Sequence, residues 1–300
     1  MGKLIGLADW FANSTVTEPQ YQDILGTVPP VRKSLIPREE IIYTSVRQNL
    51  ADTEVKYYSW SDMTDAVVSM RFEDSHDLPE VTSSTLPVPI IQKTFTIDER
   101  TFAQLRDGPG IDMATIFNSA TRQIVEREQK MILDGWSRDG TTFEVQGFKN
   151  KTGINTESTA ADFGTAGKAI TKTGLMIAEL ITDNHLGPYE MYIEATQFKE
   201  LFASHNATTD DLEMVRVQEL LQAGSTTKKN RIHLTEYGVA DGTCYITQQP
   251  DPRWGELIVA WDTTPEIIPD PANKRYKGRV YEAATVVIRD ATAICAGSAI

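Results

Sequence analysis

The sequence is poor in cysteine, the residue that builds disulfide frameworks and most zinc sites. Cys244 and Cys295 are the two cysteines among 300 residues, and they form neither a CxxC pair nor a Cys/His ligand spacing. This excludes a disulfide-rich scaffold and a zinc centre as the basis of the fold. We expect both thiols to be reduced and to lie in the core of the protein.

Positive charge is also scarce. Lys and Arg total 29 against 42 Asp and Glu, which gives a net charge of -13. A basic face that grips nucleic-acid phosphates is therefore excluded as the main function. Long apolar runs are missing as well, since no window reaches the ~18 apolar residues of a membrane span, and no secretory signal is visible. We expect no membrane partner.

Motifs for catalysis and for metal or cofactor binding are missing too. The histidines are scattered, without the HExxH pair that places two imidazoles on one helical face: His76, His185, His205 and His233. Ser75, His76 and Asp77 are consecutive, and because adjacent side chains diverge we interpret them as a solvated loop. Gly108 and Gly110, on either side of Pro109, lack the third glycine of a dinucleotide fingerprint. We therefore predict no enzyme activity, no catalytic residue, no cofactor and no metal ion.

The sequence does contain one long amphipathic helical pattern, predicted over residues 112–136. Asp112 is a candidate N-cap, and Gly135 before Trp136 indicates the end. At ~1.5 Å per residue, the helix would be about 35 Å long. Apolar residues at three- and four-residue steps predict the buried face of this spine helix: Met113, Phe117, Ala120, Ile124 and Met131.

Glu128 lies close to this apolar stripe, between Ile124 and Met131. A carboxylate in that position has two interpretations. It is either a solvated residue at the edge of the stripe or one half of a buried structural ion pair. The sequence leaves both open.

The region before the spine is predicted to form an arm and a hairpin whose open edges and aromatic side chains need a partner subunit. Prolines at 29, 30 and 37 forbid a continuous helix, so residues 1–40 read as an extended arm. Three β-rich runs, at 41–49, 55–60 and 66–72, predict a long hairpin whose edges need partners. We expect aromatic side chains of the arm and hairpin to contact other subunits: Trp10, Phe11, Tyr57, Tyr58, Trp60 and Phe72.

After the spine, a shift in composition near Gly164 predicts a boundary to an α/β region. Helices are expected near 173–184, from 196 and at 210–222, with strands at 190–193, 231–235, 242–247 and 256–261. A last long strand is predicted over 276–296. Its apolar run at Val286, Val287 and Ile288 indicates burial on both faces, where it could pack beside the spine helix.

Several passages carry a family resemblance. YYSWSDMTDAVV is followed by DLPEVTSSTLPVPIIQKTFTIDERTFAQLR, VEREQKMILDGW leads to GFKNKTGINT, and the chain closes with WDTTPEIIPDPANKRYKGRVYEAATVVIRDATAICAG. In this order they are similar to the major capsid proteins of tailed bacteriophages. The chain thus resembles the HK-ninety-seven (Johnson) capsid fold, which encapsulins share.

The resemblance implies an α+β fold in five parts. These are an N-terminal arm (1–40), an extended β-hairpin loop (41–86), a peripheral domain with the spine helix (87–164), an axial α/β domain (165–262) and return strands of the peripheral domain (263–300). Such subunits associate through many weak contacts at their edges, so function would be spread over interfaces.

The implied function is that of a viral major capsid protein. It would assemble with itself into hexamers and pentamers of an icosahedral shell around double-stranded DNA, which it would touch only non-specifically. Portal, scaffold or decoration proteins are further expected partners, and the location would be the virion, assembled in the host cytoplasm. An encapsulin-like compartment is the alternative, although the arm passage LADWFANSTVTEPQYQDIL favours the virus. A soluble α+β enzyme or binding protein is the second alternative and would require a pocket.

Overall fold

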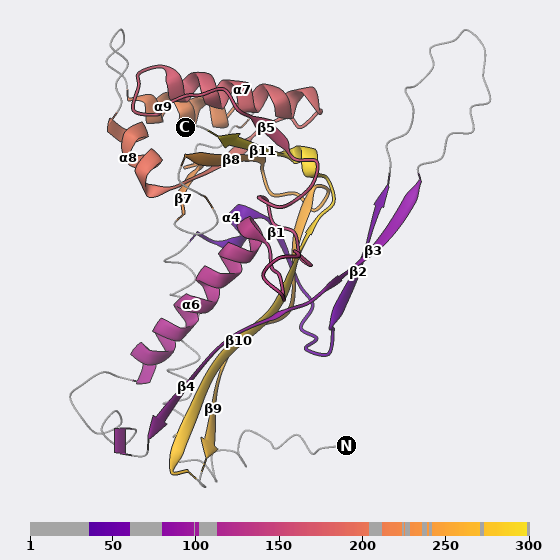
Figure 1. Cartoon of the computed structure of the whole chain (residues 1–300), viewed down its shortest axis with the longest axis vertical. Helices are drawn as coiled ribbons and strands as arrows, with labels where there is room; N and C mark the ends of the chain where they lie inside the picture. The colour runs from indigo at the N-terminus through magenta and orange to yellow at the C-terminus, as the bar shows by residue number, and fades with distance from the viewer. Residues whose placement is uncertain are drawn as a thin grey trace.

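The described strands form two sheets and a projecting hairpin. The computed structural model describes residues 36–60, 80–98, 100–101, 113–203, 212–223, 225, 229–235, 239, 242–270 and 273–298. In this part of the chain the strands form a four-stranded sheet, β1-β9-β10-β4, a five-stranded sheet, β5-β11-β8-β6-β7, and a β2-β3 pair. We call them the long sheet, the short sheet and the hairpin. Figure 1 shows the long sheet below, the short sheet above and the hairpin leaving to one side.

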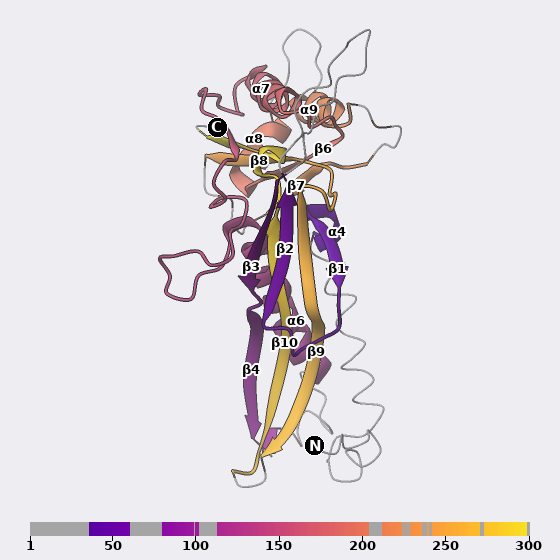
Figure 2. The same cartoon turned by 90° about the vertical axis from the view of Figure 1, so that its right-hand side faces the viewer.

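The long sheet is built on two long antiparallel strands, β9 (Gly255–Asp270) and β10 (Arg275–Ile288). β4 (Ile90–Asp98) pairs antiparallel with β10, and β1 (Tyr43–Val46) runs parallel to β9. Alternating apolar residues give these strands one face to bury, and the spine helix α6 (Met113–Asp134) lies against it. Figure 2 shows how far the two long strands extend below the short sheet.

Glycine ends the spine helix and lets the chain fold back on it. Gly135 has φ +84°, a left-handed conformation, and its N–H donates to the carbonyl of Met131 at 2.9 Å. The returning segment passes so close that a Cβ on Gly147 would lie 2.7 Å from the carbonyl oxygen of Ile132. Side chains larger than hydrogen are therefore excluded at Gly147, and the helix end and the returning loop form one packed unit.

The short sheet collects strands from distant parts of the chain. Three helices, α7 (Lys168–Thr182), α8 (Ala195–Ala203) and α9 (Glu213–Leu221), contribute to its core, and Figure 1 shows them above and beside it. β6 (Tyr189–Ile193) is buried along its whole length and has a neighbouring strand on each side. The strands of the short sheet are β5 (Asn155–Glu157), β6 (Tyr189–Ile193), β7 (Ile232–Leu234), β8 (Thr243–Gln248) and β11 (Ile294–Ser298).

The hairpin differs from the predicted pairing. We expected one long hairpin from the runs at 41–49, 55–60 and 66–72, but the first strand, β1, joins the long sheet, and β2 (Glu54–Trp60) pairs with β3 (Val81–Pro87). Two fully buried isoleucines, Ile41 and Ile42, explain the difference, because they draw β1 into the core beside β9. The expected strand at 66–72 lies outside the described residues.

Elements of the structure cross two of the predicted domain boundaries. The boundary at 262 falls inside β9, which begins at Gly255 and belongs to the long sheet throughout, and β5 joins the short sheet although it precedes residue 165. The single strand expected over 276–296 is divided between the two sheets. Asp290 accepts a hydrogen bond from the N–H of Thr292 and begins the short turn η1 (Ala291–Ala293), which redirects the chain from β10 into β11.

Candidate assembly surfaces

The base of the hairpin is anchored on the long sheet, on the face opposite α6. Val55 is fully buried there, with Tyr57 and Leu86 partly buried against the side chains of β9 and β10. Side chains alternate along a strand, so the same residues fix which face of the hairpin points outward. The hairpin is therefore a rigid extension of the long sheet at its base.

The outward face of the hairpin exposes apolar surface. Tyr58 is 48% exposed and Val81 58% exposed, and the ammonium of Lys56 lies 5.6 Å from the centre of the Tyr58 ring. Among the described residues, β2 and β3 pair with each other and with no further strand. Isolated two-stranded ribbons with open edges are marginal in water and offer their backbone groups to another chain. This geometry suits a contact between subunits.

The predicted site residues differ in burial and position, and some of them lie outside the described residues. In the spine, Phe117, Ala120, Ile124 and Met131 are buried and Met113 is half-buried at the first residue of α6. Of the predicted intersubunit residues, Tyr57 and Tyr58 lie on opposite faces of β2, and Trp60 is its last residue, paired with Val81. Trp10, Phe11 and Phe72 lie outside the described residues, as does the proposed N-cap Asp112.

Glu128 takes the buried alternative. Its side chain has no exposed surface and lies 3.6 Å from the guanidinium of Arg38, which also meets the buried carboxylate of Glu282 at 3.1 Å. The partner comes from a segment 90 residues upstream, so local spacing could show that Glu128 borders the core but not which cation reaches it.

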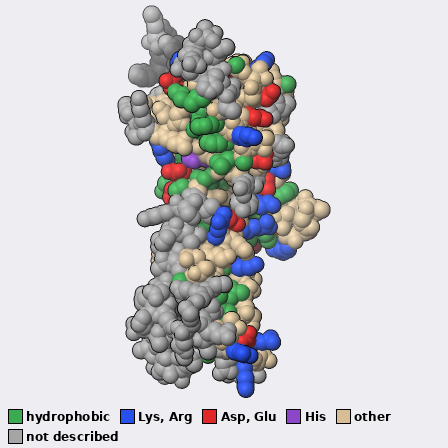
Figure 3. Space-filling model, turned by 90° about the vertical axis from the view of Figure 1, so that its left-hand side faces the viewer, with side chains coloured by type: hydrophobic (Ala, Val, Ile, Leu, Met, Phe, Trp, Pro, Cys, Tyr) green, Lys and Arg blue, Asp and Glu red, His purple; other side chains and the backbone are tan. Residues whose placement is uncertain are grey.

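A second surface on the short sheet was missed by sequence reasoning. Figure 3 shows hydrophobic side chains gathered on the upper part of the face where α8, α9 and β7 lie. Exposed members of these elements are Phe202, Val215 and Leu234. The sequence did contain an indication of this surface. Both amphipathic helices carry apolar residues outside the stripe that faces the core.

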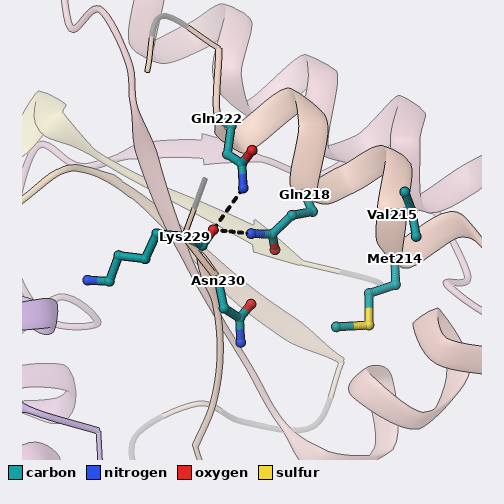
Figure 4. Close-up of a pocket in the computed structure, with 6 residues that line it drawn as sticks. All are labelled: Met214, Val215, Gln218, Gln222, Lys229 and Asn230. Carbon is teal, nitrogen blue, oxygen red and sulfur yellow. Dashed lines mark hydrogen bonds between the residues drawn. The ribbon is translucent and has the colours of Figure 1, made fainter. Parts of the chain in front are cut away.

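A groove of about 390 Å³ borders α9 on this side. Met214 and Val215 contribute its apolar lining, while the side-chain amides of Gln218 and Gln222 both donate to the backbone carbonyl of Lys229 (Figure 4). These hydrogen bonds hold the segment before β7 against the helix. A second groove, of about 310 Å³, lies between β4 and α6 over Phe95, Ile116 and Ala120.

Both cysteines are buried and free, on neighbouring strands of the short sheet. Burial raises the pKa of the Cys244 thiol and of the Cys295 thiol to about 12, because the apolar surroundings disfavour a thiolate. Within the described residues, no group of three His, Cys, Asp or Glu could hold a metal ion, and no helix is long and apolar enough to cross a membrane.

Comparison with known proteins identifies the family. A family model described as "Linocin_M18: Encapsulating protein for peroxidase" matches residues 64–231, more than half of the chain. The chain belongs to this family. No curated protein sequence matches it.

Solved structures agree on the fold. A virus-like particle from Pyrococcus furiosus is 15% identical, with a TM-score of 0.65, and the match covers 93% of this chain and 99% of that one. The capsid of Myoviridae phage XM1 is 12% identical, with a TM-score of 0.61 and coverages of 88% and 91%. The capsid of an empty GTA particle is 14% identical, with a TM-score of 0.60 and coverages of 86% and 87%.

These likenesses confirm the HK-ninety-seven-like capsid fold that the sequence passages predicted. The protein is a shell-forming protein, capsid or encapsulin-like, of a family and fold that are structural. The neighbours are assembled particles, which supports self-association and a location in a particle. The hairpin and the apolar face of the short sheet are accordingly candidate contacts between copies.

Proposed function

We propose that the protein is a viral major capsid protein whose copies assemble into an icosahedral shell. The observation that carries this is the hairpin, which is anchored on the long sheet at Val55 and exposes Tyr58 and Val81 beyond the body. A neighbouring subunit could cover these side chains and pair with the open edges of β2 and β3. A contact in which the hairpin of one copy meets a different patch on the next copy would be heterologous, and it generates a ring where the rotation between copies closes.

The long sheet with α6 would form the peripheral domain, and the short sheet would form the axial domain around the centre of each hexamer or pentamer. The apolar face of α8, α9 and β7 supports this assignment, because a ring of subunits needs a second lateral surface besides the hairpin. Shells of this kind rest on many modest interfaces, so the loss of one should abolish assembly without unfolding the subunit.

Double-stranded DNA is the proposed content. The net charge of -13 is compatible with a wall that contains DNA without binding it tightly, and contact with packaged DNA would be non-specific. Portal, scaffold and decoration proteins are the partners that such a particle would use, with assembly in the host cytoplasm. The phage and GTA particles among the structural relatives support this choice.

An encapsulin-like compartment is the second candidate, and the family match favours it. Such a shell needs an internal site for a cargo segment. The groove between β4 and α6 is a candidate, since Phe95, Ile116 and Ala120 provide an apolar floor and Lys93 a cation at its border. Particles from the native source that contain a protein cargo in place of DNA would favour the encapsulin-like compartment.

The test is expression of the protein alone, followed by size-exclusion chromatography with light scattering and negative-stain microscopy. We expect closed particles of megadalton mass. Nuclease treatment, the ratio of absorbance at 260 and 280 nm, and mass spectrometry of particles from the native source then separate DNA from protein cargo. Subunits that remain monomeric under all conditions, with scaffold and portal proteins supplied, would count against a shell.

Removal of the hairpin tests its role directly. Residues 58–83 are replaced by Asn-Gly, so that a two-residue turn closes on the Tyr57–Ser84 pair while Val55 and Leu86 stay in place. We expect folded subunits that no longer form particles.

The point variant Val81→Asp should weaken assembly, whereas Thr152→Asp, on an exposed turn elsewhere, should not. An unfolded deletion variant together with normal assembly of Val81→Asp would refute the proposed contact.

A further inference from the structure

The short helix α4 (Arg38–Ile41) lies at the junction of the two sheets, a position visible in Figures 1 and 2. Its last residue, Ile41, is buried with Ile42 in a core cluster that includes residues of α6, β6, β8, β9 and β10. The following strand, β1, extends the long sheet. This segment therefore touches every layer that meets at the junction.

One end of α4 is anchored to the long sheet and the spine. The Arg38 guanidinium meets the carboxylates of Glu128 on α6 and Glu282 on β10, both fully buried. Just before the helix, the side chain of Gln129 donates to the carbonyl of Ile36 at 2.8 Å. Separating buried charges from their partner is costly, so this end should stay in place.

The other end of α4 is attached to the short sheet by a partly exposed ion pair and by the hydroxyl of a buried tyrosine. Glu40 is 31% exposed, and one of its carboxylate oxygens lies 2.9 Å from the ammonium of Lys229, which is itself 42% exposed. The hydroxyl of Tyr192 on β6 donates to the carbonyl of Glu40 at 3.0 Å. Partly exposed ion pairs contribute modestly, so the Glu40–Lys229 pair is the polar attachment of α4 that changes most easily, while Ile41 and Ile42 stay in the core.

His233 on β7 lies beside this second attachment. Its Nε2 lies 2.9 Å from Glu190, a buried carboxylate that also holds Arg231 at 2.6 Å, and its ring stacks on Tyr192. A carboxylate can only accept, so Nε2 carries the hydrogen of the neutral ring. Nδ1 then presents a lone pair to the second Glu40 oxygen, 3.9 Å away.

A second proton on His233 changes the sign of this contact. It would place a positive charge with Nδ1 3.9 Å from the Glu40 carboxylate, which converts a weak repulsion into a charged attraction. Among the described residues, the charged and titratable groups around the ring are Glu40 from α4, Glu190 and Tyr192 from β6, and Lys229 and Arg231 from its own strand region.

We propose that α4 is a strap that fixes the short sheet relative to the long sheet, and that protonation of His233 tightens it. The Arg38 ion pairs are the stronger polar attachment, and the Glu40–Lys229 ion pair is the weaker one. In a shell whose subunits occupy non-equivalent positions, a change in strength at the Glu40 end would alter how firmly the two sheets are held together. This use rests on the proposed shell function, but the strap itself is a property of the single subunit.

Hydrogen exchange on the full-length protein tests the strap. The reporters are the amide of Ile42, which donates to Arg38 within the strap, and the amide of Thr235, which donates to Ile193 beside His233. In Glu40→Gln we expect both to exchange roughly fivefold faster than in the matched control Glu39→Gln, which removes the same charge from a side chain that is 63% exposed. The amide of Lys149 at the end of α6 serves as an internal reference.

The comparison is repeated at about pH 5.5 and pH 7.5, the range over which imidazoles ordinarily titrate. In Glu39→Gln the strap amides should be better protected at the lower pH after correction for intrinsic exchange, and in Glu40→Gln this gain should vanish. Should Glu40→Gln fail to fold, Lys229→Gln takes its place, with faster exchange but a retained pH effect. Equal protection in the charge-removal variant and its control, or a pH effect that survives in Glu40→Gln, would overturn the proposal. Light scattering reports shell assembly separately.

Discussion

The spine helix makes a quantitative prediction at Ile124. This side chain is 1% exposed and packs in a cluster with Phe117, Ile267 and Val280, which belong to α6, β9 and β10. Ile124→Ala removes three carbon atoms, each worth about 0.8 kcal/mol of burial. The surrounding β-strands are fixed by long hydrogen-bonded pairings, so the cavity should collapse only partly and add a further penalty. We expect the free energy of unfolding to fall by about 3–4 kcal/mol.

The assay is urea unfolding followed by tryptophan fluorescence and circular dichroism. Assembly stabilises folded subunits by mass action, so wild type and variant are compared at one low concentration, with the subunit mass checked by light scattering. The matched control is Gln123→Ala, the preceding residue on the same helix with an exposed side chain. Because alanine is the best helix former, this control should be neutral or slightly stabilising.

A loss below about 1 kcal/mol in Ile124→Ala, with an unchanged dependence on urea concentration, would refute the reasoning. It would mean that Ile124 is solvated or that the sheet closes freely over the gap. The harsher variant Ile124→Asp gives a second reading, since an unpaired carboxylate in this cluster should cost several kcal/mol and leave little folded protein.

Two further predictions concern the loop after the spine and the buried thiols. Gly147→Ala should lower the free energy of unfolding by about 3 kcal/mol because its Cβ would meet the backbone of α6, whereas Gly174→Ala, with nothing within 4 Å, should be neutral or stabilising; equal urea midpoints would contradict this. Cys244 and Cys295 should resist iodoacetamide at pH 8 in the folded protein, because with a pKa of about 12 roughly one thiol in ten thousand is ionised, and both should react in urea. By the same shift, stability should decline as pH rises from about 8.5, where unfolded thiols ionise, toward 12; rapid labelling of folded protein would contradict both statements.

Local pattern predicted much of the secondary structure. The spine was expected over 112–136, and the helix occupies Met113–Asp134 with its end at Gly135, because helical periodicity and a glycine stop are written in neighbouring residues. The helix expected at 210–222 is α9 (Glu213–Leu221), and the strand expected at 190–193 is β6. In each case the signal spans a single element.

Pairing between distant strands was less accessible. The alternation in residues 43–46 shows that they form a strand, but not that the strand lies beside β9 more than 200 residues later. The division of the last apolar run between β10 and β11 depends on one cap at Asp290, which resembles an ordinary surface aspartate. The partner of Glu128 was hidden for the same reason, because Arg38 is close in space and distant in the chain.

The order of strands in the short sheet has a consequence for how the subunit is made. β11 lies between β5 and β8, so one of the interior strands of the short sheet is missing until residues up to Ser298 have been synthesised. Contacts this distant in sequence close slowly and leave apolar surface uncovered while they wait. Lys172 links β11 to the earlier part of the chain, since its fully buried ammonium donates to the carbonyls of Glu157, Thr159 and Ser298. Synthesis, folding and association of this chain should therefore occur in that order, with the early parts of the subunit in need of protection until its last strand is inserted.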